Sequence, residues 1–244
     1  MDSYRPFLRR AMAAGALAGV VTALVMWLLG EPTVRKALAV ENARTPTDDS
    51  MTAVFSRGTQ VVGGLAAGLL YGLMMGVLIG LGFMLVRHRL RLTNDFQRAI
   101  AVAATGFVGA VLVPFLKYPA NPPAVGDPTT ITQRTVGYFI MVAWGLVAVI
   151  TAWRTAHAIR DRGRPSAEAT IAALVVGVAI VVIGFVVLPA SASIPADMPA
   201  GLIWKFRMVS LAGLVTTWTV FGLAFGWLMV RQPRTKAVDG TIAS

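Results

Sequence analysis

Long apolar segments alternate with short polar ones along the whole chain. Each apolar segment holds about the 20 residues that a helix needs to cross a bilayer, and none shows the two-residue alternation of a membrane barrel. The pattern therefore predicts an all-α integral membrane protein, a bundle of about six transmembrane helices arranged as three hairpins with long extracytoplasmic loops. The predicted spans are residues 11–29, 60–86, 99–116, 135–153, 169–188 and 208–230.

We expect one polytopic membrane domain over residues 1–230. The apolar run after Arg9 and Arg10 is longer than the core of a signal peptide, so we expect the first helix to be retained. The final segment, 231–244, is small and polar, which predicts a disordered cytoplasmic tail.

The composition agrees with a membrane protein. Of 244 residues, 56% are hydrophobic and 14% are charged, whereas soluble chains carry about 25% charged residues. A net charge of +11 would suggest nucleic acid in a soluble protein. Here the Lys and Arg residues gather in loops between spans, so we expect the lipid bilayer and no nucleic acid as the partner.

The distribution of Lys and Arg predicts the orientation. Of the 22 Lys and Arg residues, 14 lie on the side of both termini and 8 on the opposite side. Because cytoplasmic loops are enriched in Lys and Arg, both termini are expected in the cytoplasm. The protein is expected in the cell (plasma) membrane, with three outward-facing loops.

Two of the outward segments, 117–138 and 188–207, are rich in proline. Proline fixes φ and pushes the preceding residue into extended backbone, so each segment is expected to form a stiff cap over the helix ends. The hairpins 99–153 and 169–230 each carry such a segment, which suggests a parallel repeat. The caps and the first loop hold charges of both signs: Glu31, Asp127 and Asp197 against Lys117, Arg134, Lys205 and Arg207.

These charges admit two interpretations. The first is ion pairing and snorkelling at the membrane interface. The second is a shallow external binding site, in which the acids take a cation or the arginines take an anion. The second interpretation makes these residues candidates for an outer binding site.

A row of glycines runs along the second span at every fourth residue. Four residues turn a helix by 400°, so such a row stays nearly on one face and lets a neighbouring backbone approach closely. We expect helix packing there, with a glycine-lined substrate path as the alternative. The row comprises Gly64, Gly68, Gly72, Gly76 and Gly80.

Catalytic machinery is not apparent in the sequence. The chain has no cysteine, and its two histidines, His88 and His157, lie among arginines that would repel a dication. No nucleophile–base set, phosphate loop or pair of carboxylates is visible, so we expect no enzyme. We expect no cofactor, and any metal ligands remain unknown.

Two segments, FLKYPANPPAVGDPTTITQRT at 115–135 and LPASASIPADMPAGLIWKFRMVSLAG at 188–213, carry a family resemblance. They are similar to the outer segments of the CbtA family of predicted cobalt transporter subunits. Tyr118, Asn121, Asp127 and Arg134 match the first segment, and Arg207 matches the second. The resemblance implies a multi-span subunit for cobalt uptake that supplies cobalamin, often beside a small membrane partner with a His-rich segment.

The leading hypothesis is therefore a membrane subunit that transports divalent cobalt, or nickel. The alternative is a non-transporting structural or accessory subunit of a larger membrane complex. The candidate residues for binding in an outer vestibule are Glu31, Tyr118, Asn121, Asp127, Arg134, Asp197 and Arg207.

Overall fold

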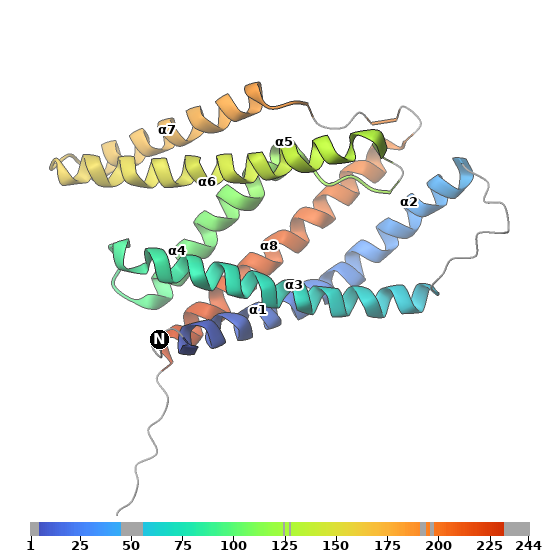
Figure 1. The fold of residues 1–244 in the computed structure, drawn as a ribbon, viewed down its shortest axis with the longest axis horizontal. Coiled ribbons are helices and arrows are strands. Elements are labelled where there is room, and N and C mark those ends of the chain that lie inside the picture. The colour runs from blue at the N-terminus through green and yellow to red at the C-terminus, as the bar shows by residue number, and fades with distance from the viewer. Residues whose placement is uncertain are drawn as a thin grey trace, which may run out of the picture.

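The computed structural model describes residues 5–44, 56–123, 125–126, 128–190, 194–195 and 198–231. The described chain is helical, and six of its helices are long and apolar enough to cross a membrane, which confirms the predicted fold class (Figure 1). In chain order the elements are α1 (Arg5–Val25), the π-helical η1 (Met26–Gly30), α2 (Glu31–Arg44), α3 (Arg57–Val86), the 3-10 turn η2 (Arg87–Arg89), α4 (Asp95–Phe107), the π-helical η3 (Val108–Leu112), α5 (Val113–Lys117), the 3-10 turn η4 (Pro128–Thr130), α6 (Ile131–Asp161), α7 (Ser166–Val187) and α8 (Ala200–Val230).

The first helix extends far beyond the predicted span. The sequence pattern predicted a loop from residue 31, but η1 and α2 continue the helix to Arg44. Proline inside a helix lacks an N–H donor and crowds the carbonyl four residues earlier. The wide turn η1, in which the Glu31 N–H bonds to Met26 O, ends at Gly30, two residues before Pro32. The helix therefore accommodates the proline with a π turn instead of ending there.

The third span also contains a π turn close to a proline. Pro114 lies two residues after the end of η3, in which the Val113 N–H bonds to Val108 O. The apolar stretch continues as helix through α5, although a proline lies in its interior. Wide turns of this kind are rare and mark places where a helix changes its local register.

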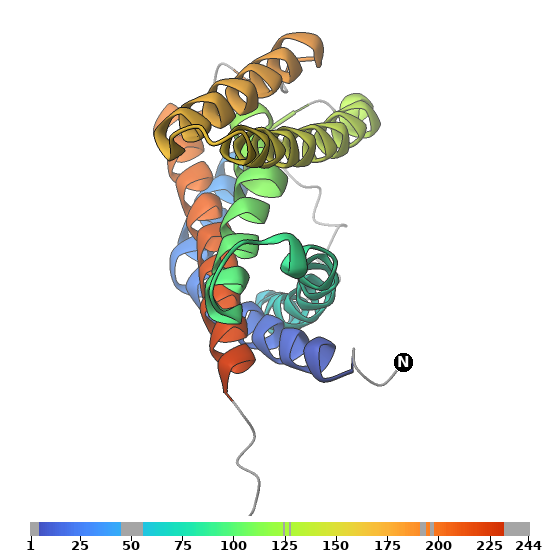
Figure 2. The same ribbon diagram turned by 90° about the vertical axis from the view of Figure 1, so that its left-hand side faces the viewer.

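The helices pack as two outer pairs with two helices between them. α1 packs on α3, and α6 packs on α7, while α8 packs on both α1 and α4. Figure 1 shows the α1/α3 pair and the α6/α7 pair on opposite sides, with the α4–α5 unit and α8 running obliquely between them. Figure 2 shows the same layers from the side. We call the end where α1 begins and α8 ends the termini end, and the end where α5 stops and α6 begins the loop end.

The glycine row of α3 lies along α1 over most of its length. A Cβ added to Gly72 would lie 2.7 Å from Gly19 Cα, and one added to Gly76 would lie 3.2 Å from Gly15 Cα. These backbones touch directly, as in small-residue crossings of membrane helices. Gly68 and Gly80 meet the Cβ atoms of alanines on α1 in the same way.

The packing prediction does not hold at Gly64. No atom lies within 4 Å of a Cβ built on that residue. The crossing of α1 and α3 has already ended there, and the neighbouring residues on this part of α3 are exposed.

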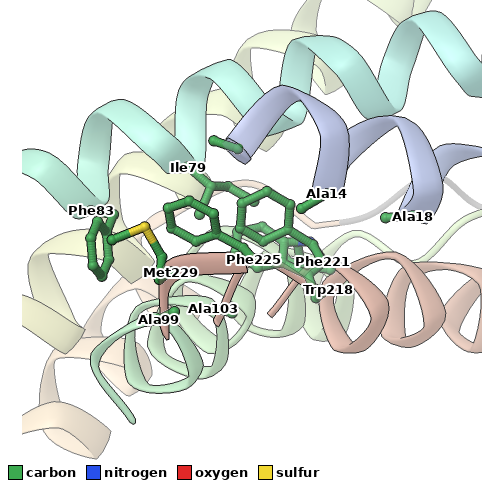
Figure 3. Close-up of a cluster of buried hydrophobic side chains, with 12 residues drawn as sticks. Ala14, Ala18, Ile79, Phe83, Ala99, Ala103, Trp218, Phe221, Phe225 and Met229 are labelled. Carbon is green, nitrogen blue, oxygen red and sulfur yellow. The ribbon is translucent and has the colours of Figure 1, made fainter. Parts of the chain in front are cut away.

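The main hydrophobic cluster fills the termini end. The Phe83 and Phe225 rings meet edge to face with centroids 5.1 Å apart, and Phe221 stacks on Phe225 at 5.4 Å. Figure 3 shows these rings enclosed between α3, α1, α4 and α8. The cluster consists of Ala11, Ala14, Ala18, Ile79, Phe83, Ala99, Ala103, Val111, Trp218, Phe221, Phe225 and Met229.

Candidate functional site at the loop end

A hollow of about 380 Å³, lined by both polar and apolar side chains, opens at the loop end. One wall is the chain that leaves α5, and the opposite wall is the first turns of α6. Three residues singled out in the sequence line it, namely Tyr118, Asn121 and Arg134. The complete lining is Tyr118, Pro119, Asn121, Val125, Ile131, Arg134, Thr135 and Tyr138.

Prolines and one glycine shape the first wall. Tyr118 precedes Pro119 and leaves the helical region, with φ −126° and ψ 72°, as a residue before proline tends to do. Gly126 has a φ of +103°, a backbone conformation that side chains disfavour. A Cβ on Gly126 would also run into the guanidinium group of Arg134. The loop therefore folds back onto α6 only because glycine stands at this position.

The same wall is tied to α7 and to the residues that follow it. The Lys117 ammonium donates to Phe185 O at 2.8 Å, and the Tyr118 hydroxyl donates to Pro189 O at 2.9 Å. Burial raises the pKa of the Tyr118 hydroxyl, so it remains a neutral donor at physiological pH. These two bonds fix the exit of α5 against the end of α7.

The second Pro-rich segment reaches the hollow through α8. Arg207 donates from Nη2 to Asn121 Oδ1 at 2.9 Å, across 86 residues of sequence. Its Nε is buried and makes no hydrogen bond to any residue in the described part of the chain. The two segments that carry the family resemblance therefore meet at one place.

Glu31 does not belong to this site. It lies at the start of α2 and accepts a hydrogen bond from Arg35 Nε at 2.8 Å. The prediction that it belongs to a loop was wrong because the helix continues past Pro32. Asp127 and Asp197 lie outside the described residues. Lys205, on the first turns of α8, is exposed.

Two polar lining residues were not among the predicted site residues. Thr135 and Tyr138 face the hollow from the first turns of α6, where the sequence shows only the start of an apolar span. Between them, Gly137 is buried, and a Cβ there would lie 3.1 Å from the Tyr118 hydroxyl oxygen. A small residue followed by tyrosine at a span entrance is the only signal that the sequence offered.

Within the described ranges, no three His, Cys, Asp or Glu side chains come close enough together to hold a metal ion. His157 Nδ1 lies 3.0 Å from Trp153 O, and His88 Nε2 accepts from Arg87 Nε at 3.0 Å. Neither histidine lines the hollow.

The replacement Tyr118→Phe tests the tie between α5 and α7. It removes only the hydroxyl that donates to Pro189 O, so we expect a loss of about 1 kcal/mol of stability, measured as a lower Tm in detergent. Tyr4→Phe makes the same chemical change outside the predicted spans and serves as the control. An unchanged Tm for Tyr118→Phe would contradict the role of this bond.

The fold and the hollow define a multi-pass helical membrane protein with a vestibule at one end of the bundle. Residues 4–230 match the family model described as "Probable cobalt transporter subunit (CbtA)". The chain belongs to this family, which confirms the resemblance seen in residues 115–135 and 188–213. No curated protein and no solved structure is similar enough to add to this assignment.

Proposed function

We propose that this protein is the membrane subunit through which divalent cobalt, or nickel, crosses the membrane to supply cobalamin synthesis. The observation that carries the proposal is that the two segments typical of the family meet at the loop-end hollow, through the bond between Arg207 and Asn121. A hollow between helices, with a few polar groups among apolar ones, is the arrangement expected of a substrate entrance.

The chemistry of the vestibule suits a hydrated cation that is captured by oxygen atoms. Asn121, Tyr118 and Thr135, which line the hollow, carry side-chain oxygen atoms. Asp127 follows the turn at Val125 and Gly126, and we assign it the role of the anionic ligand, since carboxylates and imidazoles bind divalent metals of this kind. Arg134 and Arg207 hold the two caps in place.

A second candidate is a non-transporting accessory subunit of a larger membrane complex. The observation that favours it is the guanidinium of Arg134 in the lining of the hollow, because a fixed positive charge repels a bare dication. The family description itself names a subunit. A small His-rich membrane partner that delivers the metal would explain both the positive charge in the hollow and the description of the family as a subunit.

Uptake of radiolabelled Co²⁺ separates the two candidates. We expect cells that express the protein to accumulate more cobalt than cells with an empty vector, with competition by Ni²⁺. Asp127→Asn should lower the initial rate by about tenfold or more, because changing even the outer-shell partners of metal ligands typically costs about 10–100-fold. Glu41→Gln, on α2 away from the hollow, is the matched control.

Equal accumulation with and without the protein, also after co-expression with its membrane partner, would contradict transport. Co-purification with larger partners at fixed stoichiometry, without uptake by any combination, would support the accessory subunit. The proposed orientation, with both termini in the cytoplasm of the cell membrane, is tested separately by reporter fusions at each end.

A further inference from the structure

The six membrane helices fall into two groups of three that repeat one packing pattern. The first half comprises α1, α3 and the α4–α5 unit, and the second comprises α6, α7 and α8. In each half the first helix packs on the second, as α1 does on α3 and α6 does on α7. The first helix of each half also packs on the third helix of the other, because α1 contacts α8 and α6 contacts η3 and α5. The two third helices, α4 and α8, pack on each other.

The two halves run in opposite directions. In Figure 1, α1 runs from left to right and α6 from right to left. The same reversal relates α3 to α7, and α4–α5 to α8, which traverse the middle obliquely in opposite directions. A half-turn about the line of sight therefore carries one half approximately onto the other. With the membrane normal along the long axis, this is the geometry of an inverted-topology repeat.

Two arginines support this correspondence. Arg98 lies near the start of α4, and Arg207 lies near the start of α8, each in the third helix of its half. Both have a buried Nε without a hydrogen-bond partner among the described residues. Each also donates through Nη2, Arg98 to Leu92 O and Arg207 to Asn121, both at 2.9 Å. Arg98 lies at the termini end and Arg207 at the loop end.

The contacts between the two halves also fit one alignment of the first half with the second. We align Arg98 with Arg207 in the third helices and Arg10 with Arg134 in the first helices.

Under this alignment, the contact between Thr22 and Thr217, whose hydroxyls lie 2.8 Å apart, corresponds to residues 146 and 108. The adjacent residues, Gly145 and Gly109, form the backbone contact between α6 and η3. The two independent contacts agree to within one residue in each helix.

The two ends of the bundle differ although the halves correspond. At the loop end, Thr135 and Tyr138 line the open hollow. Their equivalents under the alignment are Ala11 and Ala14, which are 0% and 1% exposed within the hydrophobic cluster. The structure therefore has one end open and the equivalent place at the other end closed.

We infer that the chain is an inverted repeat whose halves rock about the α4/α8 contact, so that the loop-end hollow closes as an equivalent hollow opens at the termini end. The second hollow would lie between the start of α1 and the end of α8, and would take the same substrate. Arg98 would border it as Arg207 borders the first. This inference rests on the proposed transport function for its purpose, but its geometry is tested without transport.

The contact at the proposed pivot suits such a motion. A Cβ on Gly222 would lie 2.9 Å from Ala103 Cβ, and one on Gly106 would meet the Trp218 ring at 2.6 Å. Small residues let the two helices cross closely. No polar contact ties α4 to α8 there, since Trp218 Nε1 is buried with no partner among the residues described.

Cysteine labelling tests the inference directly, because the natural chain has no cysteine. Single variants Ala14→Cys and Tyr138→Cys place probes at equivalent positions of the two ends. We expect an impermeant maleimide to label Tyr138→Cys from the loop end and Ala14→Cys, more slowly, from the termini end. A static bundle would leave Ala14→Cys unlabelled from either side, which would overturn the rocking motion.

A disulfide lock adds the decisive comparison. The pair Phe83→Cys and Phe225→Cys, joined through a short bis-methanethiosulfonate linker with a disulfide at each end, links the two halves at the closed end, where the centroids of the native rings are 5.1 Å apart. Added to Ala14→Cys, the lock should lower its labelling by about tenfold or more, because the open state is a minor one. Added to Tyr138→Cys, it should leave labelling unchanged or raised. The same protein after reduction controls for folding.

A link within one half is the matched control. In the pair Ala152→Cys and Gly177→Cys, a Cβ built on Gly177 lies 3.2 Å from Ala152 Cβ, close to the spacing of a disulfide. This link joins α6 to α7 inside the second half, so it should change the labelling of neither probe. Equal effects of the two links would overturn the division into rocking halves.

The labelling experiment tests the rocking motion, and the uptake experiment tests the proposed function separately. Probes that alternate in a protein that takes up no cobalt would contradict the proposed function and leave the inverted repeat intact. Cobalt uptake by a protein in which Ala14→Cys is never labelled would contradict the rocking motion alone.

Discussion

Replacing Gly72 with leucine is expected to prevent α1 and α3 from packing and to lower the stability of the protein more than any other replacement in the glycine row of α3. A Cβ at Gly72 would lie 2.7 Å from Gly19 Cα and 2.8 Å from Gly19 N. Backbone atoms cannot rotate away as a side chain can, so the two helices would have to separate along the whole crossing. Overpacking a core usually costs about 1–3 kcal/mol and sometimes more, and this site should lie at or above the upper limit.

Gly64→Leu is the matched control for this experiment. It makes the same chemical change on the same helix, but no atom lies within 4 Å of a Cβ at that position. We expect Gly64→Leu to elute as the native protein after mild heating in detergent, and Gly72→Leu to aggregate. Equal thermal stability of the two variants would show that the α1/α3 contact is not as tight as the structure describes.

Replacing Arg134 with glutamine is expected to have the largest effect on cobalt uptake. Arg134 lines the hollow, and its guanidinium packs against Gly126 in the loop that forms the opposite wall. Without it the loop loses its support on α6, and the oxygen atoms of the hollow lose their arrangement. We expect the initial uptake rate to fall by about tenfold or more, as displacements of about 1 Å in a binding site do.

Two further variants serve as controls for Arg134→Gln. Lys205→Gln removes the same charge from an exposed position at the start of α8, so it should leave uptake close to that of the native protein. Arg134→Lys keeps the charge but loses the planar, multiply donating head group, and should restore uptake only in part. If Lys205→Gln lowers uptake as much as Arg134→Gln, the effect is one of surface charge and not of the hollow.

Hydrophobicity predicted the spans well, because crossing a bilayer demands long apolar helices regardless of what they contact. It could not predict the path of the chain after Leu29. A charged residue followed by proline ordinarily ends a span, and only the wide turn η1 allows α2 to continue. Such a turn depends on the hydrogen bonds of five consecutive residues, which leave no periodic trace in the sequence.

The sequence suggested a different repeat from the one that we infer from the structure. The Pro-rich segments suggested a parallel repeat of two hairpins, yet α7 packs on α6 while α8 packs on α1 and α4. Similar loops at the same side of the membrane are visible in a sequence, whereas an inverted repeat places equivalent positions at opposite ends. There the equivalent of an alanine in the closed cluster is a tyrosine in the hollow, so the two halves differ in composition.

The sequence predicted those residues of the candidate site that have polar or charged side chains close to prolines. Tyr118, Asn121, Arg134 and Arg207 stood out as polar or charged residues beside prolines, and the structure brings them together. Thr135 and Tyr138 belong to an apolar span and gave no such signal. Glu31 was misplaced with the helix boundary, and the places of Asp127 and Asp197 in the site remain predictions.

The π turns η1 and η3 carry one further consequence, for insertions and deletions. Each behaves as one residue added to a regular helix, and one residue corresponds to a rotation of about 100° and a shift of about 1.5 Å. Deleting a single residue within Met26–Gly30 would therefore leave the composition of the span almost unchanged. It would let the wide turn close to a regular α-helical turn, so α2 and the Glu31–Arg35 ion pair would keep their side of the molecule, whereas the same deletion within the regular helix Arg5–Val25 would turn them by about 100°. In this chain, helix length alone does not decide which face α2 presents.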